Sequence, residues 1–183
     1  MKKIIVSDVT PVKTEELKKL TFRENLSVAS AIDLTGADII NLPALINSKE
    51  NEVIYRTIAE TVQNAIVMVN AGDSEQSIET AYNCIKDAKN FGLIIALPVS
   101  TALMEYGYHL KASAMKDKIV SLCRVALTKT QNVEFVAKDA MRAEKGFVEE
   151  IAVAIKELGV DTLTIPTKRA TLSPKTLRVL LKA

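Results

Sequence analysis

A repeated unit near the two ends of the chain constrains its fold more than any other feature. Residues 31–43 read Ala-Ile-Asp-Leu-Thr-Gly-Ala-Asp-Ile-Ile-Asn-Leu-Pro, and residues 154–166 read Ala-Ile-Lys-Glu-Leu-Gly-Val-Asp-Thr-Leu-Thr-Ile-Pro. Each copy has a helical pattern, a glycine suited to a left-handed helix end, an aspartate, a short apolar strand and a proline. Gly36 and Gly159 lie 123 residues apart, which leaves room for four βα units of about 30 residues each.

Short apolar runs alternate with segments of helical period along the chain, and the runs are typical of parallel strands buried on both faces. The expected strands are residues 4–9, 38–42, 65–69, 93–97, 133–137 and 162–165. Helices are expected to start at Thr21 with Glu24, at Asp73 with Gln76 and at Ser173 before Pro174, and Gly92 is expected to end a helix. The sequence predicts a single α/β domain over residues 1–183, a TIM-barrel-like array of about six of eight units. The barrel is incomplete, so its first and last strands should have unpaired edges.

Composition excludes several classes of protein. The 183 residues carry 24 Lys and Arg against 22 Asp and Glu, and a net charge of +2 gives no electrostatic case for nucleic acid or an anionic membrane. The longest apolar runs, such as residues 93–99, fall far short of the roughly 20 that span a bilayer, and the first residues run straight into a strand pattern with no secretion signal. Cys84 and Cys123 are isolated, and there is one His. We therefore expect a cytoplasmic protein with no disulfide framework and no zinc site.

Functional groups in parallel α/β folds gather at the carboxyl ends of strands. After the fifth strand, Asp139 and Arg142 either bind a polar substrate or pair with each other, and Lys168-Arg169 after the sixth either hold a carboxylate or phosphate or form a solvated loop. His109 is a general base, a ligand, or a helix-surface or packing residue. Ser100-Thr101 offers a hydroxyl without an identifiable base. Core or pocket walls are expected at Met104, Tyr106, Tyr108 and Met115.

Familiar nucleotide-binding and hydrolase patterns do not occur in the chain. There is no GxGxxG, GxxxxGK[ST], GxSxG, HExxH or HxxEH. Nucleotide-binding, serine-hydrolase and zinc-protease interpretations therefore have no motif to support them.

The order of the remaining segments is familiar. Residues 132–142 read Asn-Val-Glu-Phe-Val-Ala-Lys-Asp-Ala-Met-Arg, followed by Gly146-Phe147, the 158–166 strand unit and Leu172-Ser-Pro174. This segment resembles the fifth and sixth units of the homocitrate, isopropylmalate and citramalate synthase family, which shares a TIM barrel with hydroxymethylglutaryl-CoA lyase. Its members have V-E-F-x-x-E-D-A-x-R and I-P-D-T-x-G at these places. The resemblance extends over all six units, with Asp8-Val9-Thr10 matching the start of the D-T-T-L-R-D-G-E-Q motif.

The resemblance implies a Claisen-type condensation of an acyl-CoA with a 2-oxo acid held by a divalent metal, because negative charge develops on oxygen during enolisation and attack. The family's arginine and metal-binding aspartate positions hold Val12 and Lys13, its second-strand glutamate is Asn41, and its sixth-strand D-T pair is Thr167-Lys168. No counterpart of its H-x-H strand is found. A divalent metal is what the resemblance implies, but an ammonium in place of a carboxylate ligand disfavours a metal, so no metal ligand is assigned and no cofactor is expected.

The resemblance leaves a short set of candidate residues. The candidates for catalysis are Glu15, Asp139 and Arg142, and those for substrate binding are Asp8, Asn41, Ser100, Lys138, Arg142 and Lys168.

Three hypotheses follow from these residues. The first is that the chain is one subunit of a split synthase. Its partner brings the metal and acyl-CoA sites, and this chain is inactive alone. The second is an inactive paralogue that binds a 2-oxo acid or regulates a full-length synthase. The third is a metal-independent lyase or aldolase that uses Lys13, Lys138 or Lys168, which requires a desolvated lysine. The expected partners are a second copy of the chain or a complementary synthase subunit. The substrate and the oligomeric state are not fixed by the sequence.

Overall fold

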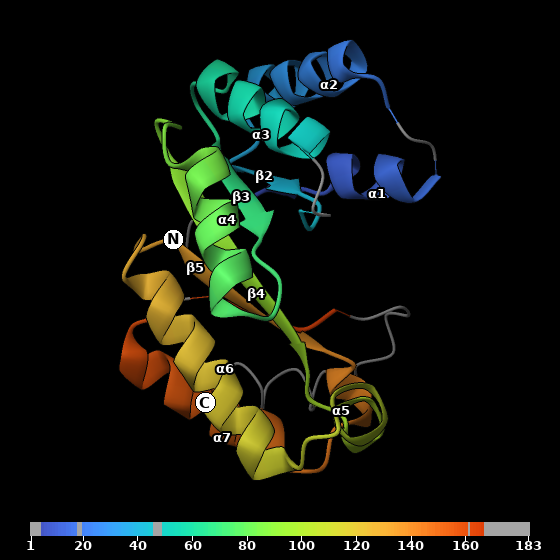
Figure 1. Ribbon diagram of the computed structural model, residues 1–183, viewed down its shortest axis with the longest axis vertical. Coiled ribbons are helices and arrows are strands. Elements are labelled where there is room, and N and C mark those ends of the chain that lie inside the picture. The colour runs from blue at the N-terminus through green and yellow to red at the C-terminus, as the bar shows by residue number, and fades with distance from the viewer. Residues whose placement is uncertain (1–4, 18–19, 46–48, 161, 167–183) are drawn as a thin grey trace. The chain divides into compact units, whose positions relative to one another are not determined.

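The computed structural model describes residues 5–17, 20–45, 49–160 and 162–166, and its strands and helices alternate along the chain (Figure 1). The strands are β1 (Ser7–Asp8), β2 (Ile39–Leu42), β3 (Ile66–Asn70), β4 (Phe91–Pro98), β5 (Val133–Lys138) and β6 (Thr162–Thr164). The helices are α1 (Thr10–Leu17), α2 (Phe22–Thr35), α3 (Lys49–Thr61), α4 (Glu75–Ile85), α5 (Thr101–Tyr108), α6 (Ala112–Leu127), α7 (Phe147–Leu158) and the 3-10 turn η1 (Ala140–Arg142).

The six strands form one sheet in chain order, β1-β2-β3-β4-β5-β6. The pairs β1–β2, β2–β3, β3–β4 and β5–β6 are parallel. Sequential parallel strands joined by helices define the (β/α) array of a TIM-barrel-like fold, and the described residues hold six of the eight strands that such a barrel has. The predicted fold class is confirmed.

The chain divides into two compact units, Met1–Ile94 (unit 1) and Ile95–Ala183 (unit 2). Each unit has its own apolar core. The largest fully buried side chains of unit 1 include Ile40, Leu42, Ile78, Ile85 and Leu93, and those of unit 2 include Leu97, Met104, Met115, Ile119, Phe135 and Ile151. Whether residues 1–183 form a single domain stays a prediction.

The repeated Gly-x-Asp pattern has a visible cause in its first copy. Gly36 ends α2 in the left-handed region with a φ of 82°. Two residues later, the Asp38 carboxylate accepts a hydrogen bond from the Val6 N–H at 3.0 Å, and the Asp38 N–H donates to the Val6 carbonyl at 2.9 Å. The aspartate therefore aligns β2 with the strand before it. In the second copy Gly159 has a φ of 97°, and Asp161 lies outside the described residues.

Helix starts follow the sequence at one place and differ from it at another. Thr21 and Glu24 form the predicted capping box of α2, with the Thr21 N–H donating to Glu24 Oε2 at 2.7 Å. The box predicted at Asp73 and Gln76 is wrong by one residue, because Ser74 and Ser77 cap each other at the start of α4. The start predicted at Ser173 lies outside the described residues.

Two strand predictions are corrected. The first strand, expected over residues 4–9, is Ser7–Asp8 within the described residues 5–9, and it ends there because Asp8 Oδ1 accepts the Thr10 N–H at 2.7 Å as the chain turns into α1. Gly92 does not end a helix. It lies inside β4, paired with Met68, because α4 already ends at Ile85.

The aromatic and methionine residues after β4 divide into two groups. Met104 and Met115 are buried, as predicted for core residues, whereas Tyr106 is 85% exposed and lines no core. Tyr108 packs its ring under Lys118 Nζ, 5.2 Å from the ring centroid.

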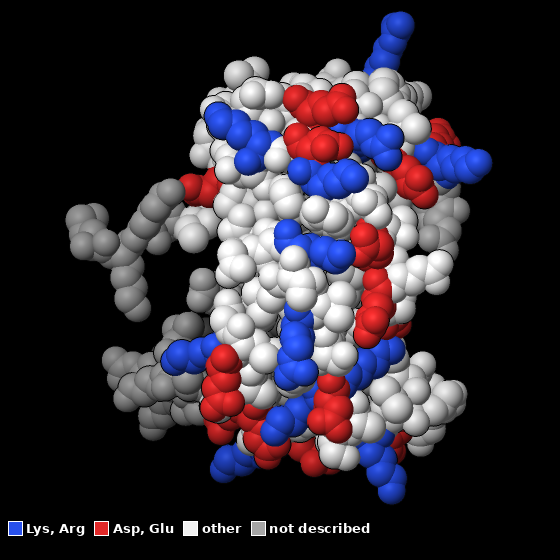
Figure 2. Space-filling model, turned by 60° about the vertical axis from the view of Figure 1, so that its left-hand side comes forward, with Lys and Arg blue, Asp and Glu red and all other residues white. Residues whose placement is uncertain are grey.

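Among the described residues, every helix is too short or too polar to cross a bilayer. On the face drawn in Figure 2, basic and acidic side chains are interspersed.

Candidate functional site

The ends of β4 and β5 bring two predicted site residues together in unit 2. The Val99 N–H donates to the Lys138 carbonyl at 3.0 Å, which aligns the two strand ends. Just beyond them, Ser100 Oγ donates to Asp139 Oδ2 at 2.5 Å. Ser100 is only 1% exposed, so its hydroxyl is a buried polar group whose partner is this carboxylate.

Arg142 completes a cluster with Asp139. Its Nε lies 2.8 and 2.9 Å from the two carboxylate oxygens, and its Nη2 lies 2.7 Å from Oδ2. The single turn of η1 places the two residues three positions apart on one side. These hydrogen bonds and the charge of Asp139 raise the pKa of Arg142 above its ordinary value. The structure thus confirms mutual pairing, one of the two predicted interpretations.

The backbone of Asp139 is unusual. Its φ is 61°, in the left-handed region that a residue with a Cβ rarely adopts. Nonglycine residues in this region cost about 1–3 kcal/mol and persist where the surroundings fix them. Here the surroundings are Ser100 and Arg142, and we call Ser100, Asp139 and Arg142 the Asp139 cluster.

The Asp139 cluster satisfies its own polar groups. Both carboxylate oxygens accept from the guanidinium and one also accepts from Ser100. Beside it, Thr101 Oγ1 donates to Glu144 at 3.0 Å. His109 is exposed and forms the left-handed C-cap of α5, which is its helix-surface interpretation. The cluster is a fixed ion pair whose outward group is Arg142, with a side chain 68% exposed.

The two lysines predicted to bind substrate, Lys138 and Lys168, add no side-chain contact to the Asp139 cluster among the described residues. Lys138 is exposed at the end of β5, and its backbone carbonyl accepts the Val99 N–H. Lys168 lies outside the described residues.

In unit 1 the predicted residues lie at the ends of β1 and β2. Asn41 Nδ2 donates to Ser7 Oγ at 2.8 Å, while Asn41 Oδ1 is buried and has no partner among the described residues. Asp8 caps the turn into α1. Glu15 lies in α1, and its side chain is outside the description. Of the replaced positions, Lys13 is exposed and Val12 is half-buried.

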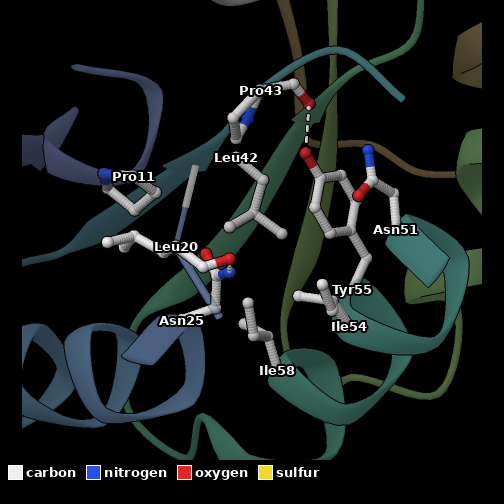
Figure 3. Close-up of a pocket in the computed structure, with 9 residues that line it drawn as sticks. All are labelled: Pro11, Leu20, Asn25, Leu42, Pro43, Asn51, Ile54, Tyr55 and Ile58. Carbon is white, nitrogen blue, oxygen red and sulfur yellow. Dashed lines mark hydrogen bonds between the residues drawn. The ribbon is translucent and has the colours of Figure 1, made fainter. Parts of the chain in front are cut away.

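A hollow in unit 1 lies beside this strand end (Figure 3). It encloses about 30 Å³, which is room for about two water molecules. Tyr55 points across it and donates from its hydroxyl to the Pro43 carbonyl at 3.2 Å. The hollow is lined by Pro11, Leu20, Asn25, Leu42, Pro43, Asn51, Ile54, Tyr55 and Ile58. Its walls are mostly apolar, and none of the described residues that line it carries a charge that could orient a substrate.

The residues do not fit the divalent metal that the resemblance implies. Within the described ranges, no three His, Cys, Asp or Glu side chains gather closely enough to hold a metal ion. The Asp139 carboxylate is occupied by Arg142, and an amide stands at Asn41. The described part of the chain therefore offers no ligand set through which a metal could act.

Sequence reasoning missed several polar residues. Ser7 and Glu144 were not singled out, and their partners lie 34 and 43 positions away along the chain. Asp33 was also missed. It is 8% exposed, and its carboxylate accepts the backbone N–H groups of Gln63, Asn64 and Ala65 at 2.8–3.0 Å. The signal that could have identified Asp33 is its charge, because it lies in the repeated unit between apolar residues of the same helix.

Comparison with known proteins places the chain in a family. The family model described as HMGL-like matches residues 4–183. The 2-isopropylmalate synthase of Heliobacterium modesticaldum is 26% identical over 184 residues, covering 100% of this chain and 36% of that protein. The enzyme of the same name from Thiobacillus denitrificans is 29% identical over 147 residues, covering 80% of this chain and 29% of that protein.

Among solved structures, a β-glucanase from Saccharophagus degradans matches with a TM-score of 0.54 at 12% identity, over 93% of this chain and 58% of that one. That likeness concerns the fold alone. The chain spans about a third of the length of the curated relatives that it matches. The family match, by contrast, covers nearly every residue, and this chain belongs to the HMGL-like family.

Proposed function

We propose that this chain is a non-catalytic subunit of a synthase that condenses an acyl-CoA with a 2-oxo acid. Its partner polypeptide carries the metal and acyl-CoA sites. The observation that supports this most is the contrast between similarity to 2-isopropylmalate synthases along the whole chain and the lack of any three-ligand metal cluster in its described part. The framework of such an enzyme is kept, while the groups that would stabilise charge in the reaction must come from elsewhere.

In this proposal the chain's own residues bind and position. The Asp139 cluster holds the Arg142 guanidinium at the carboxyl end of β5, where a bound anion would meet it. Ser100 donates a hydrogen bond to the Asp139 carboxylate, and this carboxylate in turn holds the Arg142 guanidinium in place. Neither residue has to exchange a proton for this role.

The test is activity of a complex. The tagged chain is purified from its own cells, and any partner that carries an Arg-Asp pair and an H-x-H motif is then expressed with and without it. Release of free CoA from acetyl-CoA is measured with a panel of 2-oxo acids. We expect turnover by the pair and little by either chain alone. Equal turnover by the partner alone would refute the proposal.

A second candidate function is binding of a 2-oxo acid without catalysis, as in a regulator of a full-length synthase. The 68% exposure of the Arg142 side chain favours it, because the cation is held rigidly yet remains accessible. Calorimetric titration with pyruvate and 2-oxoglutarate tests this function. Arg142→Ala should abolish binding, and Lys145→Ala, which removes an exposed cation three positions away, should leave it unchanged.

The lysine-dependent lyase gains nothing from the structure. Lys13 and Lys138 are both exposed, so neither has the desolvated surroundings that a nucleophilic lysine needs. Lys168 lies outside the described residues, and its replacement in an assay of any identified substrate would test it.

A further inference from the structure

The guanidinium of Arg142 uses only one of its edges inside the Asp139 cluster. Its Nε lies 2.8 and 2.9 Å from the two carboxylate oxygens of Asp139, and its Nη2 lies 2.7 Å from Oδ2. An arginine side chain has five N–H groups, so both N–H groups of Nη1 and the second N–H of Nη2 have no partner among the described residues. One N–H from each of these nitrogens forms the outer edge of a side chain that is 68% exposed. This edge has the geometry for two parallel hydrogen bonds to a carboxylate.

Two features of the surrounding chain cost stability, and both hold this guanidinium. Asp139 has a left-handed φ of 61°, which a residue with a Cβ rarely adopts. Ser100 is the N-cap residue of α5, yet its side chain makes no capping bond and donates to Asp139 instead. A serine at this place usually accepts a backbone N–H of the first turn, and a helix without that bond is less stable. Local conformations that cost stability are most frequent at functional sites, so the fixed position of Arg142 points to a use beyond the ion pair.

The charged groups around this edge favour an anion over a divalent cation. Cations such as Mg²⁺ are held in proteins mainly by carboxylates. Here the Asp139 carboxylate is engaged by Arg142, and Glu144 accepts a hydrogen bond from a threonine hydroxyl at 3.0 Å. Lys138, which directly precedes Asp139, is exposed and brings a second positive charge to the end of β5. A carboxylate that reaches this strand end therefore meets an open guanidinium edge, whereas a metal ion meets two positive side chains.

We propose that Arg142 binds the carboxylate of a small organic acid directly, through its Nη1–Nη2 edge, with no divalent metal between the ligand and the protein. The inference rests on the second candidate function, binding of a 2-oxo acid, and states how that acid is recognised. The resemblance implied a 2-oxo acid held by a metal, so the chain departs from it at this point. A fixed side-chain cation takes the place of the metal ion as the group that neutralises the carboxylate.

The first test is calorimetric titration of the purified full chain with pyruvate and with 2-oxoglutarate, once in EDTA and once in millimolar Mg²⁺. We expect the dissociation constants in the two buffers to agree within about twofold. Arg142→Lys keeps the positive charge but loses the planar edge, so it should weaken binding at least about tenfold. Arg124→Lys is the matched control, because Arg124 is exposed on α6 of the same unit. It should bind like the unmodified chain.

The second test looks for the metal itself. The electron paramagnetic resonance signal of free Mn²⁺ should be the same with and without the chain, both in the absence and in the presence of pyruvate. Binding that occurs only with Mg²⁺, or a free Mn²⁺ signal that the chain and pyruvate together lower, would overturn this inference and leave the second candidate function standing. So would binding that Arg142→Lys leaves unchanged, because the ligand would then lie elsewhere. No binding in either buffer would overturn both.

Discussion

The two units differ in how completely the polar groups at their strand ends are hydrogen-bonded. In unit 2, the polar groups after β4 and β5 satisfy one another in the Asp139 cluster. In unit 1, Asn41 keeps a buried oxygen without a partner among the described residues, a small hollow lies below α1, and Ile5 is exposed at the sheet edge. Both units keep buried apolar strand residues such as Ile40 and Phe135. The (β/α) framework therefore depends on these apolar faces and on crossover contacts, and it survives replacement of the residues at the strand ends.

Each unit holds one buried cysteine, so the thiols can report on the two units separately. Burial raises the pKa of Cys123 in unit 2 to about 12. In unit 1, burial and the charge of Glu52 raise the pKa of Cys84, against the opposing effect of Arg56. Near pH 8 a thiol with a pKa of about 12 is ionised in only about one molecule in ten thousand, and the thiolate is the reactive form.

The largest effect we predict is therefore on thiol labelling. In the folded protein Cys123 should react with a disulfide reagent at least about a thousandfold more slowly than in denaturant. Cys84 should react sooner than Cys123, because unit 1 has the hollow and the exposed edge. Mass spectrometry of timed samples measures both rates, with Cys84→Ser and Cys123→Ser proteins as controls. Faster labelling of Cys123 would contradict the contrast between the units.

Removing the buried carboxylate of unit 1 should cost the most stability. Asp33→Ala leaves three backbone N–H groups near residues 63–65 without their acceptor. We expect the free energy of unfolding to fall by about 3–5 kcal/mol. Urea denaturation followed by circular dichroism measures it. Asp73→Ala, at an exposed position in the same unit, should change stability little, and an equal loss in both variants would exclude the proposed cause.

The same carboxylate should make unit 1 sensitive to acid. Burial acts to raise the pKa of Asp33, but hydrogen bonds from Ala65, Gln63 and Asn64 lower it below its ordinary value of 3.8. A lowered folded-state pKa means that the unfolded chain binds protons first. The stability it contributes is therefore present above the ordinary pKa and is lost as the pH falls through the folded-state value. Asp33→Asn should lose less stability on acidification than the unmodified chain, as measured by urea midpoints across the acid range.

Local sequence patterns predicted correctly the elements whose structure depends on residues close together in the sequence. The strand expected over residues 38–42 is found at Ile39–Leu42, and the Thr21 and Glu24 capping box is found as predicted. In each case the residues that decide the structure lie next to one another. The prediction that Gly92 ends a helix was wrong. Gly92 lies inside β4 because it pairs with Met68, a distant residue that no local pattern could indicate.

The candidate site was harder to predict, because its contacts join distant residues. Asp139 and Arg142 were predicted as a possible pair from their spacing, and the structure pairs them. The hydrogen bond from Ser100 to Asp139 joins residues 39 positions apart, and Asp139 makes it with a left-handed φ of 61°. The sequence supplied both residues as candidates but not their contact, because contact depends on how two strand ends align.

Substitutions at Asp139 should separate backbone strain from lost contacts. Asp139→Ala removes the acceptor of the buried Ser100 hydroxyl and keeps a Cβ at a φ of 61°, so we expect a loss of about 2–3 kcal/mol. Asp139→Gly loses the same bonds but relieves the backbone, and should be more stable than the alanine variant by about 1 kcal/mol. Denaturation of both variants measures the difference. Equal stability of the two would show that the left-handed backbone carries no strain.

The smallest effect should come from a surface ion pair in unit 2. Lys116 Nζ lies 3.7 Å from Glu150 Oε2 and joins α6 to α7, with the two side chains 37% and 63% exposed. Exposed pairs of this kind contribute little, because solvent and salt screen them. A double-mutant cycle with both residues replaced by alanine should give a coupling below about 0.5 kcal/mol. Since Met115 and Ile151 are buried beside this pair in sequence, α6 and α7 are held to unit 2 by their apolar faces. A coupling above about 1 kcal/mol would instead assign part of that packing to charge, and the contrast with the buried carboxylate of unit 1 would weaken.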